Sequence, residues 1–104
     1  EMLPIAKREL AAAMGWYEAQ REGLGVELVR AVESLMAGLR RLPERHRIVA
    51  RRTRRARVPR FPYVVLFVME QDRILITAVL HGRRDPVRWA DRVQEPDTAY
   101  ELVV

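Results

Sequence analysis

The sequence contains no cysteine, which excludes several classes of protein at once. Without a thiol there is no disulfide scaffold, no thiol nucleophile and no thiolate metal site. The two histidines, His46 and His81, are 35 residues apart and show no HxxxH or HxH pairing, so a zinc site is not expected. We therefore expect neither a bound metal nor a cofactor.

Long hydrophobic runs are also missing. The longest apolar run, Tyr63 to Met69, has the length of a strand and falls far short of the roughly 18 residues that a membrane-spanning helix needs. The chain does not open with a charged segment followed by an apolar stretch, as a signal peptide does. We therefore expect a cytoplasmic protein with no membrane partner. Because the first residues are Glu1-Met2, we also expect a few native residues to precede them.

Acidic residues are absent from one segment of the chain. Residues 45–69 hold eight arginines and no aspartate or glutamate. By contrast, residues 1–44 carry seven acids and six bases, and residues 70–104 carry seven acids and five bases. The formal net charge of +5 therefore arises from that single acid-free segment. Such a concentration of positive charge points to an anionic partner.

What is present is enough for one folded domain. The chain has 104 residues, of which 49% are apolar, values typical of a single globular domain with its own core. In residues 6–21 the apolar side chains of Leu10, Ala13, Met14 and Tyr17 recur at helical spacing, which predicts a first helix.

A second helix is predicted over residues 25–42. Its apolar positions alternate in steps of four and three: Leu28, Val32, Leu35, Leu39 and Leu42. Pro43 ends this helix because the residue before a proline is driven out of the helical conformation. Gly23 and Gly25 allow a tight reversal between the two helices, so we expect an antiparallel helical hairpin.

The second half of the chain changes to the period of two that is typical of strands. We expect strands at residues 2–3, 47–49, 54–58, 63–70 and 73–80. Pro59 suggests that the strand at 54–58 lies at an edge, and Gln71-Asp72 form a two-residue hairpin link. Without the short candidate strand at 47–49, the expected order is β-α-α-β-β-β, an α+β fold in which the helical hairpin packs on a small antiparallel sheet. We also expect a helical turn at residues 86–92.

The two central strands have apolar residues on both faces. Strict alternation places Val64, Leu66 and Val68 on the face opposite the helices, where a sheet covered on one side only would carry polar residues. Residues 86–104, a second copy or another protein must therefore cover this face, and the sequence leaves the three open. If this face is uncovered, the free chain should self-associate through it.

The arginine run at residues 51–57 has two interpretations. Because alternate strand residues share a face, we expect Arg52 and Arg54 on one face and Arg55 and Arg57 on the other. The run either charges a solvated edge strand against aggregation or binds an anionic partner. We favour the second, since the acids vanish across the whole segment. The candidate anion-binding residues here are Arg52, Arg54, Arg55, Arg57 and Arg60.

The string His81-Gly82-Arg83-Arg84-Asp85-Pro86 follows the last predicted strand. His81 has the chemistry of an acid or base near neutral pH, and Arg83 or Arg84 has that of a phosphate ligand. The alternative is a structural turn in which Asp85 caps a following helical turn and Trp89 closes the core. Both interpretations remain open from residue chemistry alone.

Several short strings together resemble the RelE/ParE superfamily of toxins from type II toxin–antitoxin systems. They occur in the family's order as Trp16-Tyr17-Glu18, Gly23-Leu24-Gly25, Pro43-Glu44-Arg45, Arg60-Phe61-Pro62-Tyr63 and His81-Gly82-Arg83-Arg84-Asp85-Pro86. The resemblance implies a toxin domain over residues 1–92, followed by a tail at 93–104, and the β-α-α-β-β-β fold. It also implies a hetero-oligomer with a cognate antitoxin whose acidic or amphipathic C-terminal segment covers the toxin. The implied antitoxin-binding residues are Val64, Leu66, Val68, Arg57 and Trp89.

The superfamily resemblance implies one of two activities. RelE-like members cut mRNA on the ribosome, which requires cations around the scissile phosphate and a proton donor. On that pattern Arg83, Arg54 and Arg57 would surround the phosphate and His81 would donate the proton.

ParE-like members instead poison DNA gyrase by binding, and the sequence is more similar to that branch. Trp89 stands where the RelE-like tyrosine would fall and has no titratable proton, and Lys7 is the only lysine. The resemblance thus implies a gyrase inhibitor whose target-binding residues include Arg83 and Arg84. A ribosome-dependent ribonuclease is the alternative, and a non-toxic nucleic-acid-binding domain is a further one.

Overall fold

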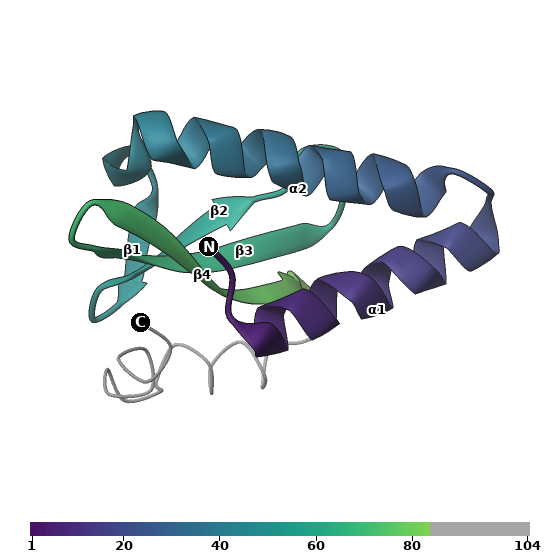
Figure 1. Ribbon diagram of the computed structural model, residues 1–104, viewed down its shortest axis with the longest axis horizontal. Coiled ribbons are helices and arrows are strands. Elements are labelled where there is room, and N and C mark those ends of the chain that lie inside the picture. The colour runs from purple at the N-terminus through teal and green to yellow at the C-terminus, as the bar shows by residue number, and fades with distance from the viewer. Residues whose placement is uncertain (84–104) are drawn as a thin grey trace.

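The computed structural model describes residues 1–83, which form a helical hairpin and a four-stranded antiparallel sheet (Figure 1). The elements are α1 (Pro4–Gln20), α2 (Leu24–Arg41), a 3₁₀ turn η1 (Pro43–Arg45), β1 (Arg47–Ala50), β2 (Thr53–Arg57), β3 (Tyr63–Glu70) and β4 (Arg73–His81). The predicted α+β fold, with the hairpin first and the sheet after it, is confirmed. The predicted helical turn at 86–92 lies outside the described residues.

The reversal between α1 and α2 depends on two glycines. Gly23 adopts φ +87°, a left-handed conformation that favours glycine. Gly25 lies against the first helix so closely that an added Cβ would stand 2.5 Å from the backbone oxygen of Met14. The Gly23-Leu24-Gly25 string therefore serves the fold, because it allows both the turn and the close approach of the helices.

Glu18 ties the end of α1 to the beginning of α2. Its carboxylate accepts hydrogen bonds from the backbone N–H groups of Gly23 at 2.9 Å and Gly25 at 2.8 Å. These bonds lower the pKa of Glu18, because they stabilise its charged form. The first turn of α2 thus obtains its cap from the preceding helix rather than from its own N-cap residue, Gly23.

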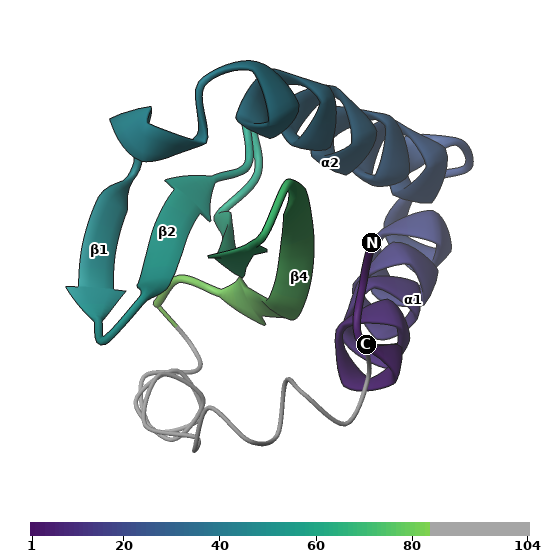
Figure 2. The same cartoon turned by 60° about the vertical axis from the view of Figure 1, so that its left-hand side comes forward.

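The strands lie in the order β1-β2-β3-β4, with every neighbouring pair antiparallel. The prediction that residues 54–58 form an edge strand is wrong, since β2 lies between β1 and β3 and the edge belongs to β1 (Figure 2). Pro59 is compatible with an internal strand because it lies beyond the paired residues, which end at Arg57. The two-residue link at Gln71-Asp72 is confirmed, and Gln71 adopts φ +54° there.

A bulge in β4 alters the alternation predicted for that strand. Leu66 is opposite Ala78 whereas Phe67 is opposite Ile76, so Thr77 is an extra residue. The Thr77 hydroxyl donates to the Leu66 backbone oxygen at 3.3 Å. Strict alternation would place Ile76 on the same face as Ala78, but the bulge puts Ile76 in the main core and Ala78 on the other face of the sheet.

The N-terminal segment docks against β4 at the bulge. The N–H of Ile76 donates to the Glu1 oxygen at 2.8 Å, and the N–H of Leu3 donates to the Ile76 oxygen at 2.9 Å. Instead of the strand predicted at residues 2–3, the structure has a single parallel bridge between Met2 and Ile76.

The main core lies between the helices and the sheet. It includes Leu28, Val32 and Leu39 of α2, and Phe67 and Ile76 of the sheet, all fully buried. Both helices lie on the same side of the sheet, with α1 next to β4 and far from β1 (Figures 1 and 2). This arrangement leaves the β1 and β2 side of the sheet farthest from α1.

A second buried cluster lies on the other face of the sheet and consists of Val64, Leu66, Ala78 and Leu80. The apolar face predicted from the sequence is therefore buried in the structure. Val68, which was grouped with this face, belongs to the main core cluster instead. The interpretation in which residues 86–104, including Trp89 and Leu102, cover this face lies outside the described residues.

Candidate anion-binding cleft

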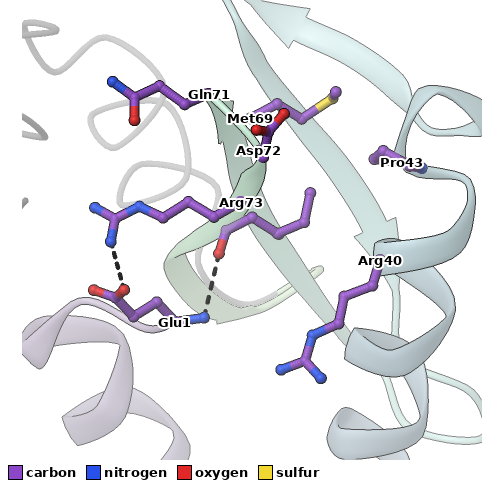
Figure 3. Close-up of a pocket in the computed structure, with 8 residues that line it drawn as sticks. Glu1, Arg40, Pro43, Met69, Gln71, Asp72 and Arg73 are labelled. Carbon is purple, nitrogen blue, oxygen red and sulfur yellow. Dashed lines mark hydrogen bonds and ion pairs between the residues drawn. The ribbon is translucent and has the colours of Figure 1, made fainter.

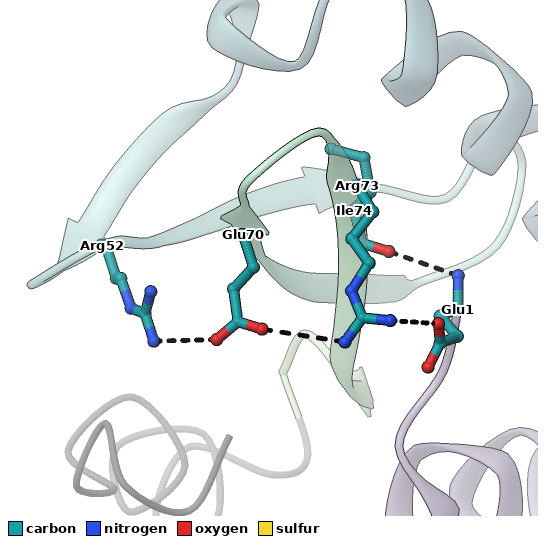
Figure 4. A network of polar contacts seen from close by, with 5 residues as sticks. All are labelled: Glu1, Arg52, Glu70, Arg73 and Ile74. Carbon is teal, nitrogen blue, oxygen red and sulfur yellow. Dashed lines mark hydrogen bonds and ion pairs between the residues drawn. The ribbon is translucent and has the colours of Figure 1, made fainter. Parts of the chain in front are cut away.

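The arginines of the acid-free segment do not act as one group, because the structure gives them different partners. Arg52 forms an ion pair with Glu70 at 3.1 Å, and Glu70 is also 3.9 Å from Arg73. Arg73 in turn contacts the carboxylate of Glu1 at 2.6 Å (Figure 4). The Arg52 charge is thus balanced within the fold. Arg52 lies in the tight turn between β1 and β2, outside the strand, so the strand alternation predicted for Arg52 and Arg54 does not apply to it.

Arg54 also has a structural partner. Its Nη1 donates to the backbone oxygens of His46 at 2.8 Å and Glu44 at 3.4 Å, so it holds η1 against β2. Burial lowers the pKa of His46, and the charges of Arg45 and Arg54 lower it further. Arg54 is therefore placed beside the 3₁₀ turn rather than with the other predicted anion-binding residues.

Three of the predicted arginines meet in one cleft at the end of the sheet. The cleft has a volume of about 520 Å³. It is lined by Arg55, Arg57, Phe61, Pro62, Tyr63, Val64, His81, Gly82 and Arg83. No acidic side chain is among these residues. Within residues 1–83, the guanidinium groups of Arg55, Arg57 and Arg83 take part in no ion pair or side-chain hydrogen bond.

The sheet register places two of these arginines. Arg55 is opposite Leu66 and Arg57 is opposite Val64, so both arginines lie on the face away from the helices. This confirms that Arg55 and Arg57 share a face, as the alternation predicts. Arg55 is half-buried and Arg57 is exposed.

The turn after β4 places the third arginine. The N–H of Gly82 donates to the Pro62 oxygen at 2.9 Å, which ties this turn to the loop before β3. The N–H of Arg83 donates to Nδ1 of His81 at 3.1 Å. The exposed side chain of Arg83 therefore begins beside the ends of β3 and β4.

The hydrogen bond from the backbone N–H of Arg83 also indicates the role of the His81 ring. A ring nitrogen that accepts a hydrogen bond carries no proton, so Nδ1 supports the turn instead of donating to a ligand. Of the two interpretations of the His81 string, this geometry favours the structural turn. Arg84, Asp85, Pro86 and Trp89 lie outside the described residues.

Two aromatic residues, Phe61 and Tyr63, also border the cleft, although neither was predicted as a site residue. The Tyr63 ring lies 5.3 Å from the His81 ring, and the Phe61 ring lies 5.2 Å from that of Tyr17. Tyr17 of α1 thus contacts both Phe61, in the loop before β3, and Tyr63, the first residue of β3, and these rings pack against the main core. The only sequence signal for these residues was the Arg60-Phe61-Pro62-Tyr63 string at the end of the arginine-rich segment.

A second hollow, of about 430 Å³, lies between the end of α2 and the β3–β4 turn (Figure 3). Its lining includes Arg40 and Arg73 but also the carboxylates of Glu1 and Asp72. Arg73 already contacts Glu1 there, so the charges of the two signs balance. The acid-free cleft is therefore the stronger candidate for an anion.

Three further predicted residues, Arg60, Leu66 and Val68, do not line the cleft. Arg60 is exposed in the loop between β2 and β3, with φ +68°. Leu66 and Val68 are fully buried, and Val64 contributes to the cleft although only 2% of its surface is exposed.

Within residues 1–83 no cluster of three or more histidine, aspartate or glutamate side chains is arranged to hold a metal ion. The described helices also include none that is long and apolar enough to cross a membrane.

Comparison with known proteins supports the resemblance seen in the sequence. A family model described as the ParE toxin of the type II toxin–antitoxin system parDE matches residues 1–86. The chain belongs to the ParE toxin family. The predicted RelE/ParE relationship, and the closer similarity to its ParE branch, are thereby confirmed.

Among solved structures, this ParE-family chain is similar to one titled "Chromosomal ParDE TA system from P. aeruginosa". The TM-score is 0.68 at 14% sequence identity, over 77% of this chain and 90% of that chain. At such low identity the similarity shows a shared fold alone. Comparison with curated protein sequences gave no match.

Proposed function

We propose that this ParE-family toxin inhibits DNA gyrase by binding to it, and that a cognate antitoxin neutralises the toxin. The observation that carries the mode of action is the acid-free cleft, where Arg55, Arg57 and Arg83 present charges that no described residue balances. An inhibitor that acts by occupying a surface needs contact groups of this kind. Charged hydrogen bonds of this type contribute about 1.5–3 kcal/mol each when fully formed.

Fewer observations support the alternative, a ribosome-dependent ribonuclease. The cleft does bring together Arg57, Arg83 and His81, three of the residues that such a mechanism requires. However, Arg54 is bonded to backbone oxygens of Glu44 and His46, and Nδ1 of His81 accepts a hydrogen bond. The positions of these two residues favour structural roles over catalysis, and so favour binding over cleavage.

The proposed antitoxin partner has support from charge and from the family. Residues 45–69 contain no acid, so an acidic C-terminal segment of an antitoxin would meet no repulsion along β1 and β2. We propose that this segment of the antitoxin covers Arg57 and the edge of the cleft next to Val64. Leu66 and Val68 are buried, so the antitoxin contacts predicted there require the side chains to be uncovered first.

The proposed function is tested by incubating the purified toxin with gyrase, ATP and plasmid. We expect inhibited supercoiling and cleaved plasmid trapped on gyrase. Removing two cleft charges in Arg55→Gln/Arg57→Gln should raise the inhibitory concentration about tenfold or more, because two charged contacts are lost. Arg30→Gln is the matched control, since Arg30 is exposed on α2 and does not line the cleft, and it should inhibit like the parent.

Two outcomes would contradict gyrase inhibition. If plasmid stays uncleaved while ribosome-bound mRNA is cut, the chain is a ribonuclease. If neither substrate is cut, supercoiling proceeds normally and bacteria overproducing the chain grow normally, the non-toxic nucleic-acid-binding alternative is correct.

A further inference from the structure

We infer that residues 87–104 bind back onto the face of the sheet opposite the helices, and that their acidic side chains occupy the arginine cleft. These residues follow the part of the chain that matches the family model, which ends at residue 86. The sequence left three candidates for the cover of this face, and the inference selects the chain's own segment over a second copy or another protein.

The first argument is the burial of the apolar cluster on this face. Its four side chains expose at most 2% of their surface: Val64, Leu66, Ala78 and Leu80. Both helices lie on the other side of the sheet (Figures 1 and 2), and within residues 1–83 Val49 of β1 is the one partly buried hydrophobic residue that packs against the cluster. Even with the stems of Arg55 and Arg57, which share this face, one valine cannot keep water from four side chains. Because the burial occurs within a single chain, the rest of the cover belongs to that chain.

The second argument is the place where the described chain ends. β4 ends at His81, one residue after Leu80 of the cluster. The N–H of Gly82 donates to the Pro62 oxygen at 2.9 Å, which holds the following turn at this end of the sheet. The 18 residues from 87 to 104 would span roughly 27 Å even as a helix. The cluster extends over only two residues of each strand, roughly 7 Å, so these residues are long enough to cover it.

The third argument is that residues 87–104 have the composition that this face requires. The face has an apolar centre on β3 and β4, flanked by arginines of β1 and β2 that form no ion pair within residues 1–83: Arg47, Arg55 and Arg57. Residues 87–104 supply large apolar side chains for the centre: Val87, Trp89, Val93 and Leu102. They also supply acids for the flank, and from residue 93 onward they contain no base: Asp91, Glu95, Asp97 and Glu101.

The arginine flank is unfavourable without such acids. Arg47 is directly opposite Arg55, and like charges in that position destabilise a sheet. Arg57 and Arg83 add two further charges at the cleft. Acids of the same chain need only weak contacts to reach these charges, because linkage gives them an effective concentration in the millimolar range.

The other occupants fit this face less well. A second copy related by twofold symmetry would bring the same arginines against these, so the repulsion would increase. A nucleic acid would neutralise the arginines, but its phosphate backbone offers no apolar group to Val64 and Leu80. An acidic, apolar segment of another protein has the required chemistry, but it would leave the burial within the single chain without a cause.

The cover is tested in the complete chain by the fluorescence of Trp89. The chain has two tryptophans, so Trp16→Phe leaves Trp89 as the only one. We expect blue-shifted emission and weak quenching by acrylamide, because a covered indole is shielded from water. Trp89→Phe is the control, since it retains Trp16, which is 48% exposed and should be quenched strongly. Quenching of Trp89 as strong as that of Trp16 would overturn the inference.

The occupation of the cleft is tested with two triple variants that change the net charge equally. The first neutralises acids of the segment, and the second neutralises exposed acids that do not line the cleft: Glu95→Gln/Asp97→Asn/Glu101→Gln and Glu22→Gln/Glu33→Gln/Glu44→Gln. The measurement is the binding of fluorescent poly-glutamate at low salt. Because the first variant loses the internal competitor for the arginines, it should bind this probe about tenfold more tightly than the second.

A further substitution locates this gain. Arg57→Gln, added to the first triple variant, should remove most of it, and so should high salt, which screens exposed charges. Equal binding by the two triple variants, or a gain that Arg57→Gln leaves intact, would overturn the inference. Thermal unfolding curves accompany each variant. If the first variant fails to fold, the quenching of Trp89 still tests the cover.

The inference and the proposed function fail separately. The consequence for gyrase rests on the proposed function: a target that contacts the cleft must displace the acidic segment, so the first triple variant should inhibit gyrase at a several-fold lower concentration. A shielded Trp89 and tighter probe binding without gyrase trapping would support the inference and refute gyrase as the target. Gyrase trapping by a chain whose Trp89 is freely quenched would refute the inference and support gyrase inhibition.

Discussion

Glu18 is one residue whose role the sequence motif did not reveal. In the resemblance it is merely part of a Trp16-Tyr17-Glu18 string, but in the structure its carboxylate accepts the N–H groups of Gly23 and Gly25. These bonds require the ionised form, which is why they lower the pKa of Glu18 below its ordinary value of 4.5. A lowered carboxyl pKa stabilises the fold above the unfolded value, and this contribution disappears as the pH falls through the folded value.

Glu18→Gln should therefore melt at a lower temperature than the parent at pH 7. The difference should shrink as the pH is lowered through and below 4.5, because the parent then loses the same carboxylate. Thermal unfolding followed by circular dichroism across this range measures it. Glu22→Gln, at an exposed position nearby, is the control and should match the parent at pH 7. A deficit that stays constant with pH would show that the charge of Glu18 is not what caps α2.

At the scale of elements, the helical hairpin depends on how closely α1 and α2 approach. A Cβ at Gly25 would stand 2.5 Å from the Met14 backbone oxygen, which cannot move without shifting α1. Gly25→Ala should therefore lower the free energy of unfolding by about 1–3 kcal/mol. Gly38 has nothing within 4 Å of its added Cβ, so Gly38→Ala should raise it by about 0.5–1 kcal/mol.

Urea unfolding of Gly25→Ala and Gly38→Ala distinguishes the effect of packing between the helices from the effect of helix propensity. Both variants replace a glycine within α2, so they differ only in what surrounds the added methyl group. A decrease in the free energy of unfolding for Gly25→Ala, together with an increase for Gly38→Ala, supports the close approach of the helices at Gly25. Stabilisation by both would mean that the helices separate freely and that the string Gly23-Leu24-Gly25 serves the turn alone.

At the scale of the whole molecule, toxin neutralisation depends on which surface the antitoxin covers. β1 and β2 lie at the side of the sheet away from α1 (Figure 2), and Arg55 and Arg57 of β2 line the cleft, so one extended acidic segment can cover both these strands and the cleft. We expect the antitoxin to protect the backbone amides around residues 54–60 from hydrogen exchange. Protection confined to α1 and α2 would show that neutralisation does not occlude the cleft.

The sequence by itself determined the elements and their order. The 4, 3, 4, 3 spacing of apolar residues in α2, the glycines before it, and the period of two in β3 and β4 are local patterns. Local patterns fix backbone conformation because they depend on residues a few positions apart. Five short strings in order were also enough to identify the family that the model match over residues 1–86 establishes.

Only the tertiary structure decided which arginines form a site. Arg54 and Arg55 are neighbours in the sequence, yet the first holds η1 and the second faces the cleft. Strand alternation separates these two arginines, but only the register with β3 decides that Arg54 lies on the face of Phe67 and Arg55 on the face of Leu66, away from the helices. This register is set by pairing between residues far apart in the chain, and a shift of one residue changes the face on which a side chain lies. Composition predicted an anionic partner, whereas the cleft that brings Arg55, Arg57 and Arg83 together exists only in the folded chain.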